Sequence, residues 1–258
     1  MVPEPFVPQK PAIELRDLHK SFGRNHVLRG VNLEILAGQS LVVIGGSGSG
    51  KSLLLKCILG LEYPDHGDIL IDGQSVLAMK PLAREQINKG IGMLFQYSAL
   101  FDSLPVWENI TFALLQERRL SRAQARNSAI ERLQQVGLEA RIADLSPAEL
   151  SGGMRKRVGL ARAVAKQPSI LFFDEPTTGL DPITARRIDH LTRHIVQTRQ
   201  ATSVTITHDI ASAKRIADRV AMIHEGQILW HGTVDEMAHS GNAYVDQFIH
   251  GALEGPIG

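Results

Sequence analysis

Residues 45–52 read Gly45-Gly46-Ser47-Gly48-Ser49-Gly50-Lys51-Ser52 and match the phosphate-loop pattern G-x-x-x-x-G-K-[ST] at every fixed position. Because glycine lacks a side chain, the backbone N–H groups of such a loop can curl around phosphate oxygens. Lys51 can then reach the β- and γ-phosphates, and the Ser52 hydroxyl can ligate magnesium. The stretch therefore predicts binding of a nucleoside triphosphate together with Mg²⁺.

The flanking sequence supplies the context that this loop requires. The apolar run 41–44 precedes it and predicts a strand, and residues 52–59 predict a helix leading out of it. The N-terminus of that helix is itself an anion site, because its first N–H groups are unpaired. A Gly/Ser-rich turn with a chance lysine is the alternative, and this strand, loop and helix order argues against it.

The composition is that of an ordinary globular protein. The chain has 258 residues, of which 43% are hydrophobic, which is enough for a substantial core. Its 28 basic and 27 acidic residues leave a net charge of +1, so nucleic acid is not an expected partner. The single cysteine, Cys57, excludes an internal disulfide and a cysteine-based zinc site, and we expect it in the core.

The two ends of the chain are expected to be tails. Residues 1–11 are rich in proline and lack the basic start and apolar stretch of a signal peptide, which predicts a flexible, extended segment on a cytoplasmic protein. Residues 251–258 are assigned to a C-terminal tail. No run of about 18 apolar residues occurs, so we expect a partner to span any membrane at which the chain acts.

Strand and helix signals alternate along the rest of the chain. Apolar, β-rich runs predict strands at 13–18, 27–35, 41–44, 69–71, 91–95, 170–173, 202–207 and 220–224. Ile188, Leu191 and Ile195 recur at helical spacing between two of these runs, and Glu225-Gly226 predicts a hairpin turn. The alternation predicts an α/β fold with a parallel sheet covered on both faces.

Residues 97–166 differ in character and predict a mostly helical insert. Ser121 and Gln124 have the spacing of a helix-start box, and Gly137 can end the helix that they begin. We assign residues 12–250 to one domain that contains this insert.

Two carboxylates follow the apolar run 170–173. A continuous apolar run suits a strand buried on both faces, and ligands of open α/β sheets bind at the carboxyl ends of such strands. We expect Asp174 to help hold magnesium and Glu175 to act as the general base for the attacking water. The alternative is a pair of surface carboxylates that begin a turn at Pro176.

The stretch Leu150-Ser151-Gly152-Gly153-Met154-Arg155-Lys156-Arg157 makes a poor helix start on its own. Adjacent glycines weaken a first turn, and three cations lie near the helix end that prefers negative charge. Both features make sense if an anion docks there, with Ser151 and the basic residues adding donors and charge. A solvated basic helix with Ser151 as a simple N-cap remains the alternative.

These motifs together resemble the nucleotide-binding subunit of an ATP-binding-cassette (ABC) transporter. Residues 150–154 match the family signature Leu-Ser-Gly-Gly-Gln, except that Met154 stands in the glutamine place. Four further residues stand at motif positions of that family: Gln96 (Q-loop), Asp181 (D-loop), His208 (switch histidine) and Phe22 (adenine-stacking aromatic).

The resemblance implies an ABC-type P-loop NTPase fold, in which a mostly parallel core sheet carries an N-terminal antiparallel β subdomain and an inserted helical subdomain. It also implies a homodimer in which Ser151, Gly152 and Gly153 of one copy close over the ATP held by the other. Gln96 would contact Mg²⁺ and the attacking water, and His208 would contact the γ-phosphate.

Each of these four residues also has an ordinary structural interpretation. Asp181 before Pro182 is a good helix N-cap, and His208 and Gln96 can be polar strand ends. Phe22 can be a core residue instead of an adenine platform. The order of all the motifs along the chain favours the functional interpretation.

Residues 92–110 are similar to the corresponding segment in ATPases of Mla-type, MCE-associated intermembrane phospholipid transport systems. This implies an inner-membrane permease, an MCE-domain lipid-binding protein and a small STAS-domain protein as partners, at the cytoplasmic face of a bacterial inner membrane. The exposed apolar residues expected at the permease interface are Leu100, Phe101, Leu104, Val106 and Trp107. An importer of amino acids or another small solute, and a soluble ABC ATPase such as one in iron–sulfur assembly, are the alternatives.

Overall fold

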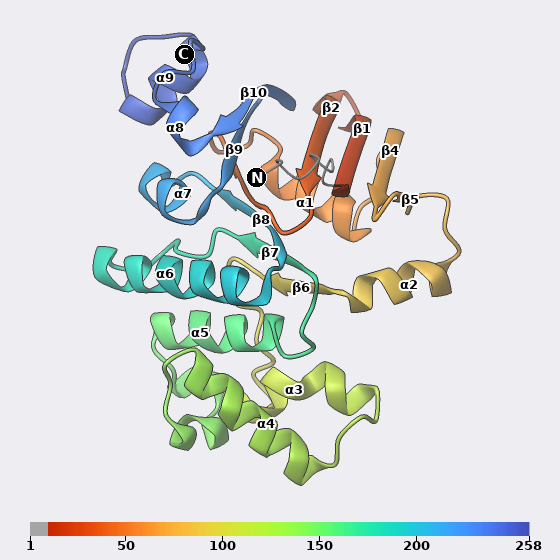
Figure 1. The fold of residues 1–258 in the computed structure, drawn as a ribbon, viewed down its shortest axis with the longest axis vertical. Coiled ribbons are helices and arrows are strands. Elements are labelled where there is room, and N and C mark those ends of the chain that lie inside the picture. The colour runs from red at the N-terminus through yellow and green to blue at the C-terminus, as the bar shows by residue number, and fades with distance from the viewer. Residues whose placement is uncertain (1–9, 258) are drawn as a thin grey trace, which may run out of the picture.

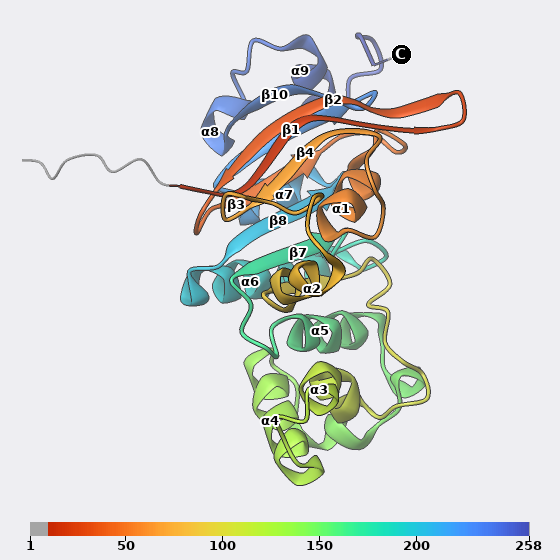
Figure 2. The same ribbon diagram turned by 90° about the vertical axis from the view of Figure 1, so that its right-hand side faces the viewer.

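Helix α1 (Lys51–Leu59) lies between two β-sheets (Figures 1 and 2). The computed structural model describes residues 10–257. The smaller sheet is antiparallel with strand order β2-β1-β4-β5, and its strands are β1 (Pro11–Phe22), β2 (Asn25–Leu36), β4 (His66–Ile71) and β5 (Gln74–Ser75). Most of the predicted 1–11 tail lies outside the described residues, but Pro11 does not belong to a tail, because it begins β1 and pairs with Leu36 of β2.

The larger sheet has the order β10-β9-β3-β8-β7-β6. Its strands are β3 (Ser40–Ile44), β6 (Ile91–Leu94), β7 (Ile170–Asp174), β8 (Thr202–Thr207), β9 (Arg219–His224) and β10 (Gln227–Thr233). Pairing is parallel except at the edge, where the predicted hairpin sets β10 antiparallel to β9. The expected α/β fold with a mostly parallel sheet and a separate antiparallel sheet is confirmed.

One apolar core joins the two sheets through α1. Leu15 and Leu18 of β1, Leu54 and Ile58 of α1, and Phe172 of β7 are all at most 2% exposed and belong to the same cluster. The predicted core residue Cys57 is fully buried in this cluster as well. Burial of α1 on both sides fixes the phosphate loop, because the loop ends where this helix begins.

A second core lies on the opposite face of the large sheet. Leu171 and Phe173 of β7 point into it and meet the helices α3 (Val106–Gln116), α4 (Arg122–Gln135), α5 (Gly152–Ala163) and α6 (Pro182–Arg199). Figure 1 shows these helices stacked away from the sheet, with α5 between α6 and the pair α3 and α4. The short 3-10 helices η1 (Ala140–Asp144) and η2 (Pro147–Glu149) connect α4 to α5.

Local capping explains where α4 of the helical insert begins. Ser121 accepts a bond from the Gln124 backbone N–H, and the Gln124 side chain accepts one from the Ser121 backbone, as the predicted helix-start box requires.

The expectation that Val106 and Trp107 are exposed is wrong. Val106 and Trp107 are 0% and 8% exposed, because they begin α3 and pack inward against the second core.

A third core covers the β9 side of the sheet. Helices α7 (Ile210–Ile216), α8 (Val234–Met237) and α9 (Ala243–His250) pack there, while α2 (Pro81–Lys89) lies near the opposite edge, beside β6.

The segment after α9 folds back, since the backbone N–H of Ile257 donates to Gln247 Oε1 over 2.7 Å. Across residues 10–257 we find no helix with the length and apolar character needed to cross a membrane.

Gly92 gives a test of this packing. A methyl group there would lie 2.2 Å from the Ala163 carbonyl oxygen and 2.8 Å from Leu171 Cδ2, so β6 and α5 would have to separate. We expect Gly92→Ala to lower the free energy of unfolding by about 1–3 kcal/mol in a urea titration. Gly46→Ala is the matched control, because nothing lies within 4 Å of the new methyl group. Equal stability of the two variants would contradict the close contact between β6 and α5.

Candidate functional site

The phosphate loop lies between β3 and α1, as the sequence predicts. Gly45 has φ of 157° and approaches β9 so closely that a Cβ atom would lie 2.2 Å from the Ile223 carbonyl oxygen. Gly50 directly precedes α1 and offers no side chain to cap it, so the first N–H groups of the helix face a hollow of about 220 Å³. The lining residues of this hollow are Val27, Gly48, Ser49, Gly50, Lys51, Ser52 and Leu53.

Lys51 is held inside the loop. Its side chain donates to the carbonyl oxygens of Gly45 and Gly46, each over 2.7 Å, and the residue is only 7% exposed. Burial lowers the pKa of Lys51, and the negative charges of Glu175 and Asp174 partly oppose that effect. A phosphate oxygen would be a stronger, charge-assisted acceptor than either carbonyl, so the lysine is placed to exchange one for the other.

The parallel strands bring the predicted catalytic groups to one edge of the sheet. Ile44 of β3 is in register with Thr207 of β8, and Asp174 of β7 is in register with Ile206 of β8. The phosphate loop, the two carboxylates and His208 therefore leave the sheet side by side. Gln96 joins them, because β6 runs parallel to β7 and ends two residues before it.

Asp174 has the features of a cation ligand. Its Oδ1 atom is buried and has no hydrogen-bond partner among residues 10–257. Burial raises the pKa of Asp174, and the neighbouring Glu175 raises it further. A divalent cation would satisfy the orphaned oxygen and favour the ionised carboxylate. The donor set of Asp174, Ser52 and Gln96 offers only oxygen ligands, which Mg²⁺ prefers.

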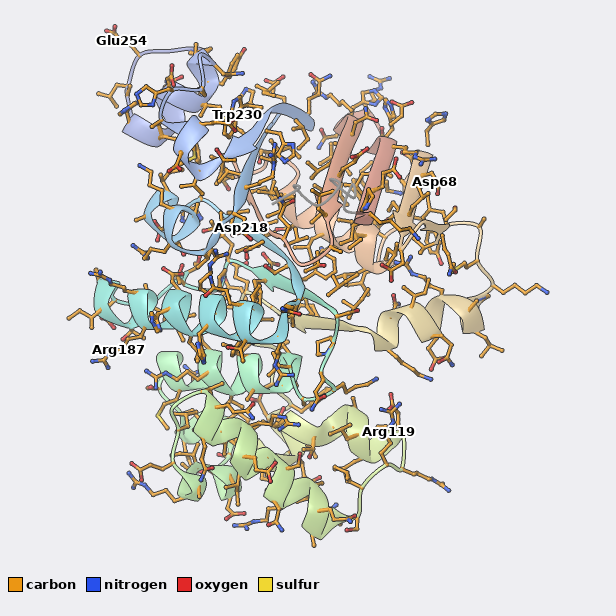
Figure 3. The ribbon with its side chains drawn as sticks, viewed as in Figure 1. Asp68, Arg119, Arg187, Asp218, Trp230 and Glu254 are labelled. Carbon is orange, nitrogen blue, oxygen red and sulfur yellow. The ribbon has the colours of Figure 1, made fainter. Side chains whose placement is uncertain are left out.

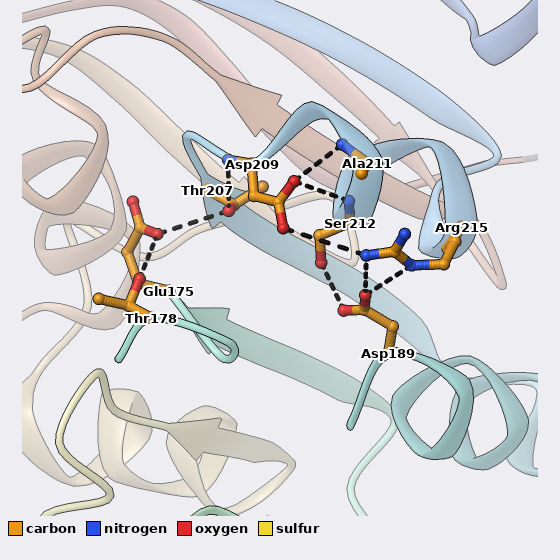
Figure 4. Close-up of polar contacts among 8 residues, drawn as sticks. All are labelled: Glu175, Thr178, Asp189, Thr207, Asp209, Ala211, Ser212 and Arg215. Carbon is orange, nitrogen blue, oxygen red and sulfur yellow. Dashed lines mark hydrogen bonds and ion pairs between the residues drawn. The ribbon is translucent and has the colours of Figure 1, made fainter. Parts of the chain in front are cut away.

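Glu175 is the most constrained residue of the site. Its backbone is left-handed, with φ of 46°, a conformation that costs a non-glycine residue about 1–2 kcal/mol. Thr178 donates to Oε2 over 2.9 Å and Thr207 over 3.4 Å (Figure 4). His208 Nδ1 lies 2.9 Å from Oε1. The Glu175 carboxylate therefore lies at the carboxyl end of the sheet, within hydrogen-bond distance of His208.

A polar network fixes the segment that carries His208. Asp209 caps α7 by accepting bonds from Ala211 and Ser212, and its own N–H donates to the Thr207 hydroxyl (Figure 4). The fully buried side chain of Asp189 on α6 then binds Ser212 and accepts a 2.8 Å bond from Arg215 Nε. His208 itself is 61% exposed at its side chain, so it faces solution while its neighbours are held.

The signature segment and the D-loop line a different hollow, of about 370 Å³. Ser151 caps α5 by accepting a bond from the Met154 N–H, and Asp181 caps α6 by accepting bonds from Ile183 and Thr184. Both residues are therefore helix N-caps, and the Ser151 hydroxyl keeps its proton to donate. Among the described residues, this hollow and that of the phosphate loop have no lining residue in common.

We expected the basic residues after the signature to contact an anion, but Arg155 and Lys156 bond to main-chain carbonyls instead. Arg155 donates to the Leu150 carbonyl over 2.9 Å. Lys156 is 5% exposed and turns inward, where its ammonium group bonds to the Gln96 carbonyl and, over 3.1 Å, to the Glu175 carbonyl. Burial lowers the pKa of Lys156, and Asp174 and Glu175 oppose that effect. Lys156 therefore joins the backbones of Gln96 and Glu175 to the helix that begins at the signature.

Arg162 extends this contact along the same face of α5. Its guanidinium donates to the Ala99 carbonyl over 2.7 Å and the Ser98 carbonyl over 2.5 Å. Both residues have left-handed backbones, with φ of 44° at Ala99 and 61° at Ser98. The sequence predicted an anion-binding role for Lys156 and no role for Arg162. The sequence feature that could have indicated their contacts is a spacing of three residues: Lys156, Gly159 and Arg162 follow one another along α5, and Gly159 packs against Ser98.

Phe22 is on the surface, which rules out the core interpretation. The residue is 51% exposed, and Lys20 Nζ lies 5.2 Å from its ring centroid. An exposed ring at this position is free to stack on a base.

Lys156 gives a test of the coupling between these segments. We expect Lys156→Met to reduce the turnover rate for nucleoside triphosphate at least about tenfold, because two buried carbonyls lose their donor. The KM should change much less, since no phosphate-loop atom is removed. Lys156→Gln, which keeps a donor, should recover part of the rate. Lys166→Met, which breaks a mostly buried ion pair with Glu117 just beyond the end of α5, is the control. A full turnover rate in a folded Lys156→Met protein would contradict the positioning role.

Known proteins share both the sequence and the fold. The family described as ABC transporter matches residues 28–178. Protein TRIGALACTOSYLDIACYLGLYCEROL 3, chloroplastic, of Arabidopsis thaliana is 39% identical over 95% of this chain and 75% of its own length. The intermembrane phospholipid transport system ATP-binding protein MlaF of Haemophilus influenzae is 35% identical over 95% and 92%. The L-cystine import ATP-binding protein TcyN of Bacillus subtilis is 38% identical over 92% of each chain.

A solved structure gives the same result. The dimeric, post-hydrolysis state of the ATP-binding cassette MJ0796, bound to ADP and Pi, superposes with a TM-score of 0.79 at 32% identity, covering 86% of this chain and 98% of that one. The family match spans more than half of the sequence and includes the phosphate loop, the signature segment and both carboxylates. The chain belongs to the ABC transporter family, as one of its ATP-hydrolysing subunits.

Proposed function

We propose that this chain hydrolyses ATP to power the movement of phospholipids between an inner and an outer membrane. Two relatives support a lipid cargo: MlaF, named for intermembrane phospholipid transport, and the Arabidopsis protein, whose name is that of a galactolipid. The resemblance of residues 92–110 to the same segment of phospholipid-transport ATPases agrees with them. That segment contains the Q-loop and the start of α3, so we expect a transporter-specific partner to bind there.

A small-solute importer is the second candidate. The cystine-import ATPase TcyN is as similar in sequence as the phospholipid-transport ATPases are. The catalytic motifs do not separate the two, because both kinds of transporter need the same ATP chemistry. The cargo must therefore be decided through the membrane partner.

The separation of the two hollows supports a composite ATP site in a head-to-tail homodimer. Lys51 and Ser151 line different hollows of one chain, so a nucleotide held by the phosphate loop leaves the signature residues free for a second copy. The dimeric MJ0796 cassette supports the same assembly. In that assembly Ser151, Gly152, Gly153 and Asp181 would face the nucleotide of the partner.

The site residues then have distinct roles in hydrolysis. The glycine-rich loop and Lys51 would bind the phosphates, and Phe22 would stack on adenine. Ser52, Asp174 and Gln96 would hold Mg²⁺, which supplies positive charge against the phosphates when bound. Glu175 would accept a proton from the attacking water, and His208, whose Nδ1 lies 2.9 Å from that carboxylate, would contact the γ-phosphate.

An apolar groove supports docking of an inner-membrane permease. The groove has a volume of about 400 Å³ and lies next to the Q-loop. Phe95 and Phe101 line it with exposures of 37% and 44%, and the nearby Tyr97 is 83% exposed. These aromatics replace Val106 and Trp107 as the exposed docking residues. An MCE-domain protein and a STAS-domain protein would complete the system at the cytoplasmic face of the membrane.

Glu175→Gln tests the catalytic assignment. The amide is close in shape to the carboxylate but cannot accept the water proton, so we expect ATP hydrolysis to fall about 10²–10⁴-fold while ATP binding persists. ATP with Mg²⁺ should then convert the protein to a stable dimer in light-scattering measurements. Lys51→Ala provides the contrast, because it should lose both hydrolysis and tight ATP binding. A monomeric and fully active Glu175→Gln protein would refute the assignment.

Purification of the transporter tests the cargo. Tagged Glu175→Gln chain, extracted from its own cells in detergent, should bring down a polytopic permease and an MCE-domain protein with bound phospholipid. Tyr97→Ser should weaken this association without lowering the thermal midpoint, since the ring is largely exposed. Tyr63→Ser, at 66% exposure on the loop after α1, is the control that should keep the partners. Recovery of a permease with an amino-acid-binding protein would favour the importer, and soluble partners alone would contradict both.

A further inference from the structure

We propose that the antiparallel sheet carries a binding site for a divalent transition metal, formed by Asp17 and His19 of β1 and His66 of β4. The three residues offer one ligand atom each, and these atoms all lie within 4.8 Å of one another. Asp17 Oδ1 is 2.9 Å from His19 Nε2, and Asp17 Oδ2 is 3.4 Å from His66 Nδ1. The carboxylate thus lies between two imidazoles from different strands.

The backbone places these side chains together through a break in strand regularity. His19 and His66 are direct partners in the antiparallel register of β1 and β4, with shifts in the ladder between Arg16 and His19. Asp17 occupies the irregular stretch with φ of 47°. This bulge re-aims the Asp17 side chain toward the two histidines, as bulges commonly do.

Backbone hydrogen bonds hold the arrangement from both sides. The Asp65 N–H donates to the His19 carbonyl over 2.8 Å, which anchors the residue before His66. The Asp17 N–H donates to Asn32 Oδ1 over 2.9 Å. Gly67 lets β4 pass close to the bulge, because a Cβ atom there would lie 2.3 Å from the Asp17 carbonyl oxygen. The three ligands therefore start from fixed backbone positions, which reduces the entropic cost of binding.

The spacing fits a tetrahedral ion. Ligand bonds of about 2.0–2.2 Å to zinc place neighbouring ligand atoms about 3.3–3.5 Å apart. The 3.4 Å between Asp17 Oδ2 and His66 Nδ1 lies within that range, and the 2.9 Å between Asp17 Oδ1 and His19 Nε2 lies below it. The imidazole rings are edge-to-face with centroids 5.7 Å apart, so modest rotation of exposed side chains brings both nitrogens to one ion.

The donor set selects the class of metal. Two imidazoles with one carboxylate suit Zn²⁺, Cu²⁺ or Ni²⁺, whereas Mg²⁺ and Ca²⁺ prefer oxygen ligands. Asp68, labelled on β4 in Figure 3, is not a fourth ligand, because its Oδ1 accepts bonds from the Ile69 N–H and the Ser75 hydroxyl. The ligand side chains are 44–72% exposed, so water would complete the coordination.

The test uses the full-length, untagged chain. Nucleotide is left out, so that its phosphates cannot bind the added metal. Zn²⁺ should bind with one-site stoichiometry in calorimetry, and Co²⁺ should give the visible absorption of a tetrahedral centre. Asp17→Asn, His19→Gln and His66→Gln should each weaken Zn²⁺ binding at least about tenfold. His26→Gln should leave the affinity unchanged, since His26 bonds to Ser21 instead. All four variants should unfold at the same temperature as the parent protein.

Two outcomes would overturn the proposal. The first is no Zn²⁺ binding at millimolar metal, which would leave the three residues as a hydrogen-bonded cluster. The second is binding that the three ligand variants do not affect, which would place the metal elsewhere on a chain with ten histidines.

Discussion

Burial of β7 on both faces is the constraint on which the rest of this structure depends. Phe172 points toward α1 and the antiparallel sheet, while Leu171 and Phe173 point toward the helices of the insert. Each face needs its own cover, so the strand forces a helix on either side of the sheet. The first polar residues that can follow such a strand emerge at its carboxyl end, which is where Asp174 and Glu175 meet the phosphate loop.

The second organising interaction is the inward-facing Lys156. A buried cation is tolerated only when its donors are satisfied, and here the acceptors are two main-chain carbonyls from segments that are remote in sequence. The helix that begins at the signature cannot shift without changing the contact to Gln96 or Glu175. Arg162 makes a similar contact six residues further along the helix, so two side chains tie α5 to the loop around Gln96.

Most of the fold was readable from the sequence because its signals are local. The phosphate loop, the strand runs and the Ser121–Gln124 box each depend on a few neighbouring residues, and all are present. Lys156 and Trp107 were misjudged because their direction is set by tertiary packing: a cation near a helix start and an aromatic near a loop look exposed until the opposing surface is known. The Asp17, His19 and His66 cluster was invisible for a related reason, since it depends on strand register and a bulge.

Cys57 has a practical consequence beyond its place in the core. It is the single cysteine of the chain, and burial raises the pKa of its thiol to about 11, so almost no thiolate is present near neutral pH. Maleimide reagents should therefore not react with Cys57 in the folded protein. The chain therefore already has the low background that spectroscopic labelling needs, and one engineered surface cysteine would carry the probe and report local movements during turnover.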